Sequence, residues 1–278
     1  MVWVGNKEIA WCPGCGNFPI RTALESVLKE LPVPARNIVL TSGIGQAAKM
    51  PHYLDTNFFN GLHGRALPLA VGIKLARPDL TVIAVSGDGC NYGEGGNHFI
   101  QTIRKNMDLT ILTCDNKVYA LTKGQTAPTT ETGIKNNLDP QGNENRPLNP
   151  VSLAVAMGAP FVARGFAGDP DHLKMILREA ILFKGTAVVD IFQPCVTFNH
   201  VNTYQWYKDR VYRLDAPASD RYEALKTAEI WGERIPIGII FRDDAARPRE
   251  GGRILFQEPP GEKAIEAILR QHHFSMRE

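Results

Sequence analysis

Short apolar runs alternate along the chain with longer stretches in which apolar residues recur at helical spacing. The apolar runs have the length and composition of buried strands, and they lie at 37–43, 81–87, 109–115, 161–166 and 186–193. Helical patterns fill the segments between them, at 17–30, 65–76, 93–105, 150–157 and 170–183. The alternation predicts an α/β fold, a parallel sheet with helices on both faces. Ligands of such sheets bind beyond the carboxyl ends of the strands.

Two segments depart from this alternation. Residues 125–150 are polar and rich in Pro, Asn and Thr, and the pattern resumes directly after them, so we expect a long functional loop there. Beyond about residue 197 the pattern fades, apart from a strand-like run at 235–242. We therefore expect a main domain over 1–197 and an extension over 198–278 that packs on this domain or on another subunit.

Composition and charge narrow the class of protein. The formal net charge is only +2 and no long basic block is present, so nucleic acid is not the expected partner. No stretch approaches the roughly 18 apolar residues of a membrane span, and the first residues lack the pattern of a signal peptide, so a soluble cytoplasmic protein is expected. The odd number of cysteines, 5, favours reduced thiols or metal ligation over a disulfide framework.

The stretch "TVIAVSGDGCNYGEGG" (81–96) carries the most specific chemistry. An apolar strand ends at Gly87, and further glycines surround the start of the next helix, so the backbone can approach an anionic group there. Asp88 cannot bind a phosphate directly, but a divalent cation such as Mg²⁺ can bridge the two. A second oxygen ligand is then expected at the end of the next strand, where Asn116 stands in "CDNKVYALTKGQ".

A GDG motif followed at this spacing by Asn resembles the diphosphate and Mg²⁺ motif of thiamine diphosphate (TPP) enzymes. The resemblance implies that the Asp88 and Asn116 side chains and the Val118 carbonyl bind Mg²⁺. Several flanking segments narrow it to the beta subunit of the two-subunit 2-oxoacid:ferredoxin oxidoreductases: "WCPGCGN" (11–17), "SGIGQAAKMPHY" (42–53), "GLHGRALPLAVGIKLARPDL" (61–80), "GGNHFIQTIRKNMDLTIL" (95–112) and "YALTKGQTAPTT" (119–130).

The resemblance implies a reaction, a domain and a set of site residues. The main domain is expected to be a TPP diphosphate-binding domain, and the reaction to be oxidative decarboxylation of a 2-oxoacid with coenzyme A, giving acyl-CoA, CO₂ and reduced ferredoxin. "YALTKGQ" is more similar to the 2-oxoglutarate or broad-specificity branch. Lys49 and Lys123 are implied to meet the anionic substrate. The residues implied to surround TPP are Ile44, Gly45, Gln46, Ala47, His63, Gly64, Gly89, Cys90, Leu121 and Thr122.

The cysteines depart from the family pattern. Members that carry a 4Fe-4S cluster hold it with four cysteines, and three of these positions match Cys12, Cys15 and Cys195. The fourth position is Gln46, which leaves five alternatives: a non-cysteine fourth ligand, a three-iron cluster, a remote cysteine, bound zinc, or no cluster, with electrons leaving through another subunit. Cys90 should face TPP and Cys114 should lie in the core, so neither is expected to replace the fourth cysteine. We favour an iron–sulfur cluster.

A further expectation concerns the partner. TPP enzymes use a Glu from a pyrimidine-binding domain, and this chain has the length and motifs of only the diphosphate-binding half. The resemblance therefore implies an active site shared with an alpha subunit. Two other classes stay open: a non-redox TPP decarboxylase subunit, and a catalytically silent scaffold subunit.

Overall fold

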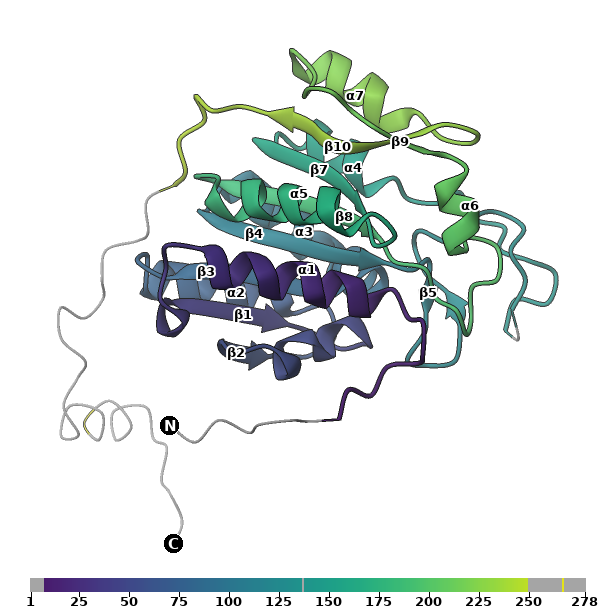
Figure 1. Cartoon of the computed structure of the whole chain (residues 1–278), viewed down its shortest axis with the longest axis horizontal. Coiled ribbons are helices and arrows are strands. Elements are labelled where there is room, and N and C mark those ends of the chain that lie inside the picture. Colours follow the sequence, from purple (N-terminus) through teal and green to yellow (C-terminus); the bar gives the residue numbers. More distant parts are fainter. Residues whose placement is uncertain (1–7, 137, 250–266, 268–278) are drawn as a thin grey trace, which may run out of the picture.

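The computed structural model describes residues 8–136, 138–249 and residue 267 (Figure 1). One sheet of eight strands runs through the molecule in the order β2-β1-β3-β4-β8-β7-β10-β9. The strands are β1 (Ile38–Ser42), β2 (Asn57–Asn60), β3 (Thr81–Gly87), β4 (Leu109–Asp115), β7 (Phe161–Phe166), β8 (Thr186–Phe192), β9 (Val211–Arg213) and β10 (Ile235–Arg242). Neighbouring strands are parallel except β10, which pairs antiparallel with β7.

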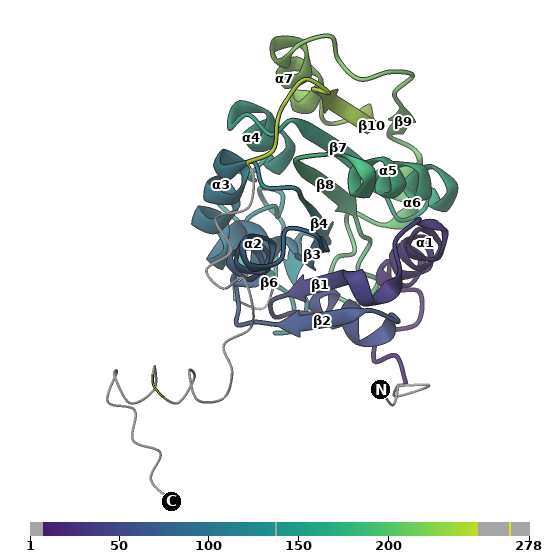
Figure 2. The ribbon, with the colours of Figure 1, turned by 90° about the vertical axis from the view of Figure 1, so that its left-hand side faces the viewer.

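Helices cover both faces of the sheet, as Figure 2 shows. α1 and α5 lie on one face, and α2, α3 and α4 lie on the other. The helices are α1 (Asn17–Glu30), α2 (Ala66–Ala76), α3 (Gly96–Lys105), α4 (Pro150–Ala156), α5 (Pro170–Leu182), α6 (Tyr204–Lys208) and α7 (Arg221–Glu229), with short turns η1 (Ala35–Asn37), η2 (Ala47–Tyr53) and η3 (Gly89–Glu94). Each face has its own apolar core against these helices. The predicted α/β fold is confirmed.

Burial explains why these segments form strands. Every residue of β4 and of β8 is buried, including the polar residues that interrupt their apolar sequences, Thr110, Thr113, Asp115, Thr186 and Asp190. The edge strand β2, in contrast, exposes three of its four residues, and its sequence "NFFN" carries no strand signal. The helix expected at 93–105 begins at Gly96, because the preceding residues form the π-helical turn η3 directly after Asp88.

The described part of the extension packs on the main domain. β10 is hydrogen-bonded to β7 and adds β9 to the sheet. Tyr207 of α6 and Ile237 of β10 are buried against Phe166 and Phe192 of the central strands. Within the predicted extension, residues 250–266 and 268–278 lie outside the described residues. Within the described ranges, no helix is long and apolar enough to span a bilayer.

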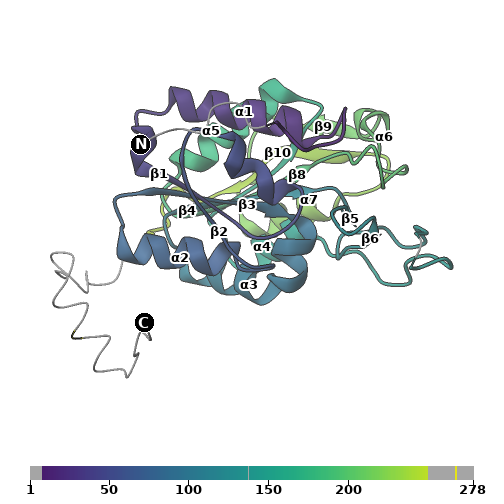
Figure 3. The same cartoon turned by 90° about the horizontal axis from the view of Figure 1, so that it is seen from below.

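The long loop after β4 leaves the sheet at its carboxyl edge. It contains the small hairpin of β5 (Val118–Tyr119) and β6 (Gln125–Thr126), which Figure 3 shows projecting beyond the ends of the strands. Its return path reaches Pro150, where α4 begins and the side chain of Asn149 accepts a hydrogen bond from the Ser152 amide. The loop therefore lies at the edge of the sheet where the ligands of such folds bind.

Candidate functional site

A pocket of about 60 Å³ lies at the carboxyl edge, where the segments after β1, β3 and β4 meet. We call it the strand-end pocket. It is lined by Ile44, Gly45, Gln46, Ala47, His63, Gly87, Asp88, Gly89, Cys90, Asn116, Val118, Tyr119, Ala120, Leu121 and Thr122. The three predicted Mg²⁺ ligands and all predicted TPP contacts except Gly64 are thus brought together. Gly64 lies beside the pocket, and its amide donates to Cys90 Sγ at 3.2 Å.

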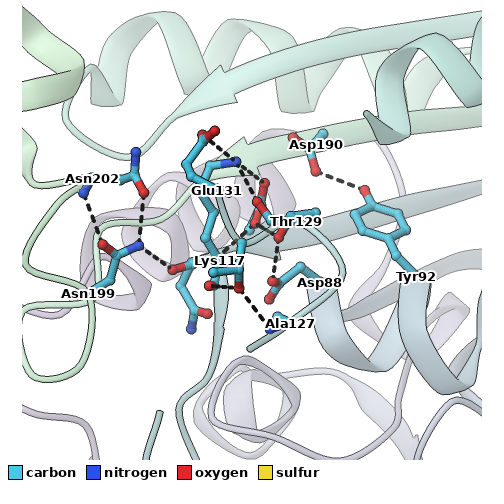
Figure 4. A network of polar contacts seen from close by, with 12 residues as sticks. Asp88, Tyr92, Lys117, Ala127, Thr129, Glu131, Asp190, Asn199 and Asn202 are labelled. Atoms are coloured by element: carbon cyan, nitrogen blue, oxygen red, sulfur yellow. Dashed lines mark hydrogen bonds and ion pairs between the residues drawn. The ribbon is translucent and has the colours of Figure 1, made fainter. Parts of the chain in front are cut away.

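Asp88 is the charged centre of this pocket. It is 2 % exposed, and its Oδ2 accepts a hydrogen bond from Thr129 Oγ1 at 2.7 Å, while the same hydroxyl lies 2.8 Å from Asp115 Oδ1 (Figure 4). Burial, and next the charge of Asp115, raise the pKa of Asp88 well above its usual range. One hydroxyl proton cannot serve two carboxylates at once. A cation at Asp88 would compensate this concentration of negative charge.

Asn116 and Val118 complete a set of hard oxygen donors. The Asn116 side-chain oxygen accepts from the Val118 amide at 3.0 Å, which fixes the turn after β4. The Asn116 carbonyl accepts from Asn199 Nδ2 at 3.1 Å, so the extension also supports this turn. Carboxylate, amide and carbonyl oxygens are the donors that Mg²⁺ prefers. The residues present therefore fit the metal that the sequence predicts, and a diphosphate beside it.

Two glycines are required by close approaches at the pocket. A Cβ on Gly89 would lie 2.2 Å from the ring of Tyr119, and a Cβ on Gly64 would lie 2.5 Å from the Glu94 carbonyl carbon. Gly64 also has φ +71°, a conformation that favours glycine. The turn after Asp88 thus depends on Gly89 within it and on Gly64, which packs against its end at Glu94.

The rim of the pocket contains an acid–imidazole pair that the sequence pattern does not reveal. His63 Nδ1 lies 3.0 Å from Glu94 Oε2, an ion-pair distance, although the contact lacks hydrogen-bond geometry. The Tyr119 hydroxyl donates to the same carboxylate oxygen at 3.2 Å. Burial, with the charge of Glu94 as the next cause, raises the pKa of Tyr119 above its usual range, so this hydroxyl stays protonated.

The role expected for Lys49 and Lys123, contact with the anionic substrate, stays a prediction. Lys49 is half-buried on η2 and Lys123 is exposed with φ +81°, and neither lines the strand-end pocket. The buried lysine at this edge is Lys117, which is 4 % exposed. Its ammonium donates to Thr129 O at 3.1 Å and lies 3.8 Å from Asp115 Oδ2 and 3.5 Å from Glu131 Oε1. Its positive φ of 62° and burial are features that only the structure reveals.

A larger cavity of about 280 Å³ lies beyond Lys117, and no predicted site residue lines it. Its walls include Asp115, Arg164, Asp190 and Trp231. Burial, reinforced by Asp115, raises the pKa of Asp190 to about 7, and Asp190 accepts a hydrogen bond from the Tyr92 hydroxyl at 2.8 Å. We assign the candidate chemistry to the smaller strand-end pocket, because the predicted ligands and contacts converge there.

The three matched cysteines line a third pocket, of about 30 Å³, which we call the cysteine pocket. Its lining includes Cys12, Cys15, Cys195, Gln46, Asn17 and Gln193. Burial above all, and then the neighbouring Cys195 and Cys12, raise the pKa of Cys15 to about 11. Both side-chain atoms of Asn17 and the amide oxygens of Gln46 and Gln193 are buried without a hydrogen-bond partner. Gln193 Nε2 donates to Cys15 Sγ at 3.5 Å.

The thiols share this pocket without forming a preassembled ion site. Within residues 8–136 and 138–249, no three His, Cys, Asp or Glu side chains are grouped to hold a metal ion. Cys114 is buried in β4, and Cys90 lines the strand-end pocket, so neither lines the cysteine pocket. Their positions agree with the roles expected for them, and the ligand set at the cysteine pocket stays a prediction.

Known proteins share both the sequence and the fold of this chain. The family described as "Thiamine pyrophosphate enzyme, C-terminal TPP binding domain" matches residues 41–191, and the family of the C-terminal part of the pyruvate ferredoxin oxidoreductase beta subunit matches residues 195–251. The 2-oxoacid:ferredoxin oxidoreductase subunit beta of Saccharolobus solfataricus is 42 % identical, over 92 % of this chain and 90 % of the relative. Subunit beta of 2-oxoacid:ferredoxin oxidoreductase 1 of Aeropyrum pernix is 45 % identical, over 83 % of this chain and 77 % of the relative.

Two further comparisons carry a 2-oxoglutarate name. The 2-oxoglutarate oxidoreductase subunit KorB of Mycobacterium tuberculosis is 44 % identical, over 71 % of this chain and 53 % of the relative. A solved 2-oxoglutarate:ferredoxin oxidoreductase from Magnetococcus marinus, with 2-oxoglutarate, coenzyme A and succinyl-CoA bound, superimposes with a TM-score of 0.86. Its sequence is 33 % identical, and the match covers 95 % of this chain and 93 % of that chain.

Proposed function

This chain belongs to the family of 2-oxoacid:ferredoxin oxidoreductase beta subunits, and on that premise we propose that it binds Mg²⁺ and TPP in an enzyme that oxidises 2-oxoacids. The proposed products are acyl-CoA, CO₂ and reduced ferredoxin. 2-Oxoglutarate is the favoured substrate, because relatives and a solved structure named for it match most of the chain. The observation that carries the proposal is the convergence of Asp88, Asn116 and Val118 on one pocket within the matched family region.

The chain's own residues have distinct proposed tasks. Asp88, Asn116 and the Val118 carbonyl hold the metal, and the glycine-rich turn after β3 admits the diphosphate. When bound, TPP supplies the nucleophilic carbon and the electron sink for decarboxylation. Ile44 and Leu121 supply apolar walls to the pocket. Exclusion of water strengthens the electrostatic attraction between the metal and its oxygen donors.

The substrate and the partner subunit are expected at the open side of this pocket. We propose that Lys49 and Lys123 meet the substrate carboxylates, since Lys123 directly follows the pocket residues Leu121 and Thr122. Among the described residues that line the pocket there is no glutamate. We propose that an alpha subunit supplies the glutamate that TPP enzymes take from a pyrimidine-binding domain and so completes the site, while Glu94 at the rim is held by His63 and Tyr119.

We propose that Cys12, Cys15 and Cys195 hold an iron–sulfur cluster that passes electrons to ferredoxin. Their shared pocket and its unpartnered buried amides support this assignment. Iron and labile-sulfide analysis of the anaerobically purified complex, with EPR after reduction, tests it. We expect iron and sulfide together, whereas one zinc and no iron would refute the cluster and favour the non-redox decarboxylase.

The reaction itself is tested on the complex of this chain with its alpha subunit. Reduction of ferredoxin or viologen is measured with coenzyme A and 2-oxoglutarate, pyruvate, branched-chain or aryl 2-oxoacids. We expect turnover in the complex, highest with 2-oxoglutarate, and none in the isolated chain. Full turnover by the isolated chain would disprove the shared site, and absence of turnover with every 2-oxoacid would disprove the oxidoreductase. The cytoplasm is the proposed location, in keeping with the unpaired cysteines.

A further inference from the structure

The metal-side carboxylate Asp88 is held by a residue from a remote part of the chain. Thr129 lies 41 residues after Asp88, in the loop that follows the β5–β6 hairpin, and is fully buried. Its hydroxyl donates to Asp88 Oδ2, so this contact fixes one oxygen of the carboxylate (Figure 4). The Gly89 amide is a further donor to this carboxylate.

The turn that carries Thr129 is itself fixed by other hydrogen bonds. Thr130 Oγ1 donates to the Lys117 carbonyl at 2.6 Å and accepts from the Ala127 amide at 2.8 Å. The Thr130 carbonyl accepts from Asn143 Nδ2 at 2.8 Å. These contacts do not involve Asp88, so the turn forms a support that exists independently of the group it positions.

Lys117 places a positive charge beside the turn that carries Thr129. Its ammonium holds the Thr129 carbonyl and lies between Asp115 and Glu131, while its own amide donates to Asp115 Oδ1 at 3.1 Å. A buried carboxylate is costly unless it is paired and hydrogen-bonded. Because Lys117 compensates Asp115, the Thr129 hydroxyl is available to Asp88.

We propose that Thr129 is a positioning residue for the metal site. Lys117 supports Thr129 through the hydrogen bond to its carbonyl. The Thr129 hydroxyl orients the Asp88 carboxylate before Mg²⁺ and TPP bind, so that no reorientation is needed on binding. Residues that orient metal ligands typically contribute about 10- to 100-fold to metal affinity. The inference rests on the proposed function, because it presumes that Asp88 binds Mg²⁺.

The test compares three variants of the complex with its alpha subunit. Thr129→Val removes the hydroxyl and keeps the shape, whereas Thr129→Ser keeps the hydroxyl. Thr186→Val is the matched control, since Thr186 is also fully buried and donates to a backbone carbonyl, that of Met107 at 2.8 Å, at the start of β8. TPP affinity is measured by calorimetry over a range of Mg²⁺ concentrations, and thermal stability is measured without either ligand.

For Thr129→Val we expect Mg²⁺-dependent TPP binding to weaken about 10- to 100-fold, with partial recovery at high Mg²⁺. Thr129→Ser should restore affinity to within about 3-fold, and Thr186→Val should lower stability while leaving TPP affinity within about 3-fold of the wild type. Wild-type TPP affinity in Thr129→Val, or equal losses of TPP affinity in Thr129→Val and Thr186→Val, would overturn this inference and leave the proposed function intact. Absence of Mg²⁺-dependent TPP binding in the wild-type complex would overturn the proposed function as well.

Discussion

The strand-end pocket and the cysteine pocket are neighbours that share Gln46, Asn116 and Ala120 in their walls. Beside the strand-end pocket, the buried Thr129 hydroxyl lies within hydrogen-bond distance of the pocket residue Asp88 and of Asp115. In the cysteine pocket, several buried amide atoms have no hydrogen-bond partner. Buried polar groups without partners are costly in a folded protein. The two sites thus differ in how their buried polar groups are partnered: Asp88 has a side-chain donor, whereas both polar side-chain atoms of Asn17 have none.

The two pockets nevertheless share one electrostatic feature. Burial raises the pKa of Asp88 at the first site and of Cys15 at the second, and a neighbouring acidic group raises each further. A cation would favour the ionised form of either group. The contrast between the sites thus lies in hydrogen bonding, while burial raises the pKa of an acidic group in both.

The largest expected effect comes from removing the Asp88 carboxylate from the strand-end pocket. Asp88→Ala removes the only carboxylate among the proposed Mg²⁺ ligands, so we expect TPP affinity of the complex to fall by at least about 100-fold, beyond the effect of an orienting residue. Calorimetry with TPP and Mg²⁺ measures it. Asp171→Ala, which changes an exposed carboxylate of α5, is the control. An unchanged affinity in Asp88→Ala would remove Asp88 from the metal site.

A second prediction concerns the reactivity of Cys15 in the metal-free complex. Only the thiolate reacts with iodoacetamide, and a pKa of about 11 instead of 9.0 leaves about 100-fold less thiolate at pH 8. Deprotonation increases as the pH rises, so the alkylation rate of Cys15 should increase about tenfold per pH unit up to about pH 11. Mass spectrometry follows Cys15 beside exposed Cys12. A rate for Cys15 that levels off below pH 9 would contradict the raised pKa.

The smallest expected effect tests the difference in hydrogen bonding between the two pockets. Asn17 is fully buried and both of its side-chain polar atoms lack hydrogen-bond partners, so Asn17→Leu should change the stability of the metal-free protein by less than about 1 kcal/mol. Thr129→Val, which leaves Asp88 without its donor, should cost about 1–3 kcal/mol. Chemical denaturation of both variants compares them. A larger loss in Asn17→Leu than in Thr129→Val would reverse the contrast.

Much of the fold follows from sequence periodicity, because most residues of the central strands are apolar. β4 and β8 are buried at every position, and the predicted runs 109–115 and 186–193 coincide with them to within one residue. Edge strand β2 could not be found this way, since exposed positions carry no apolar pattern. The π-helical turn η3 was also not predicted, because glycines mark a close turn without specifying its hydrogen bonds.

The candidate site was predictable where it depends on strand ends and was not where it depends on distant contacts. Asp88 and Asn116 each directly follow a strand, and parallel strands bring such residues to one edge. Thr129 and Asn199 reach that edge from segments without a periodic pattern. Whether a lysine is buried also depends on tertiary packing, which is why Lys117 was not singled out.

The central claim is that the strand-end pocket holds TPP through Mg²⁺, and its most direct test is the affinity of the wild-type complex for TPP with Mg²⁺ and with EDTA. Calorimetry at several fixed Mg²⁺ concentrations gives this dependence. We expect EDTA to weaken TPP binding by at least about 100-fold, and TPP and Mg²⁺ each to strengthen the binding of the other. Equal TPP affinity with Mg²⁺ and with EDTA would contradict it.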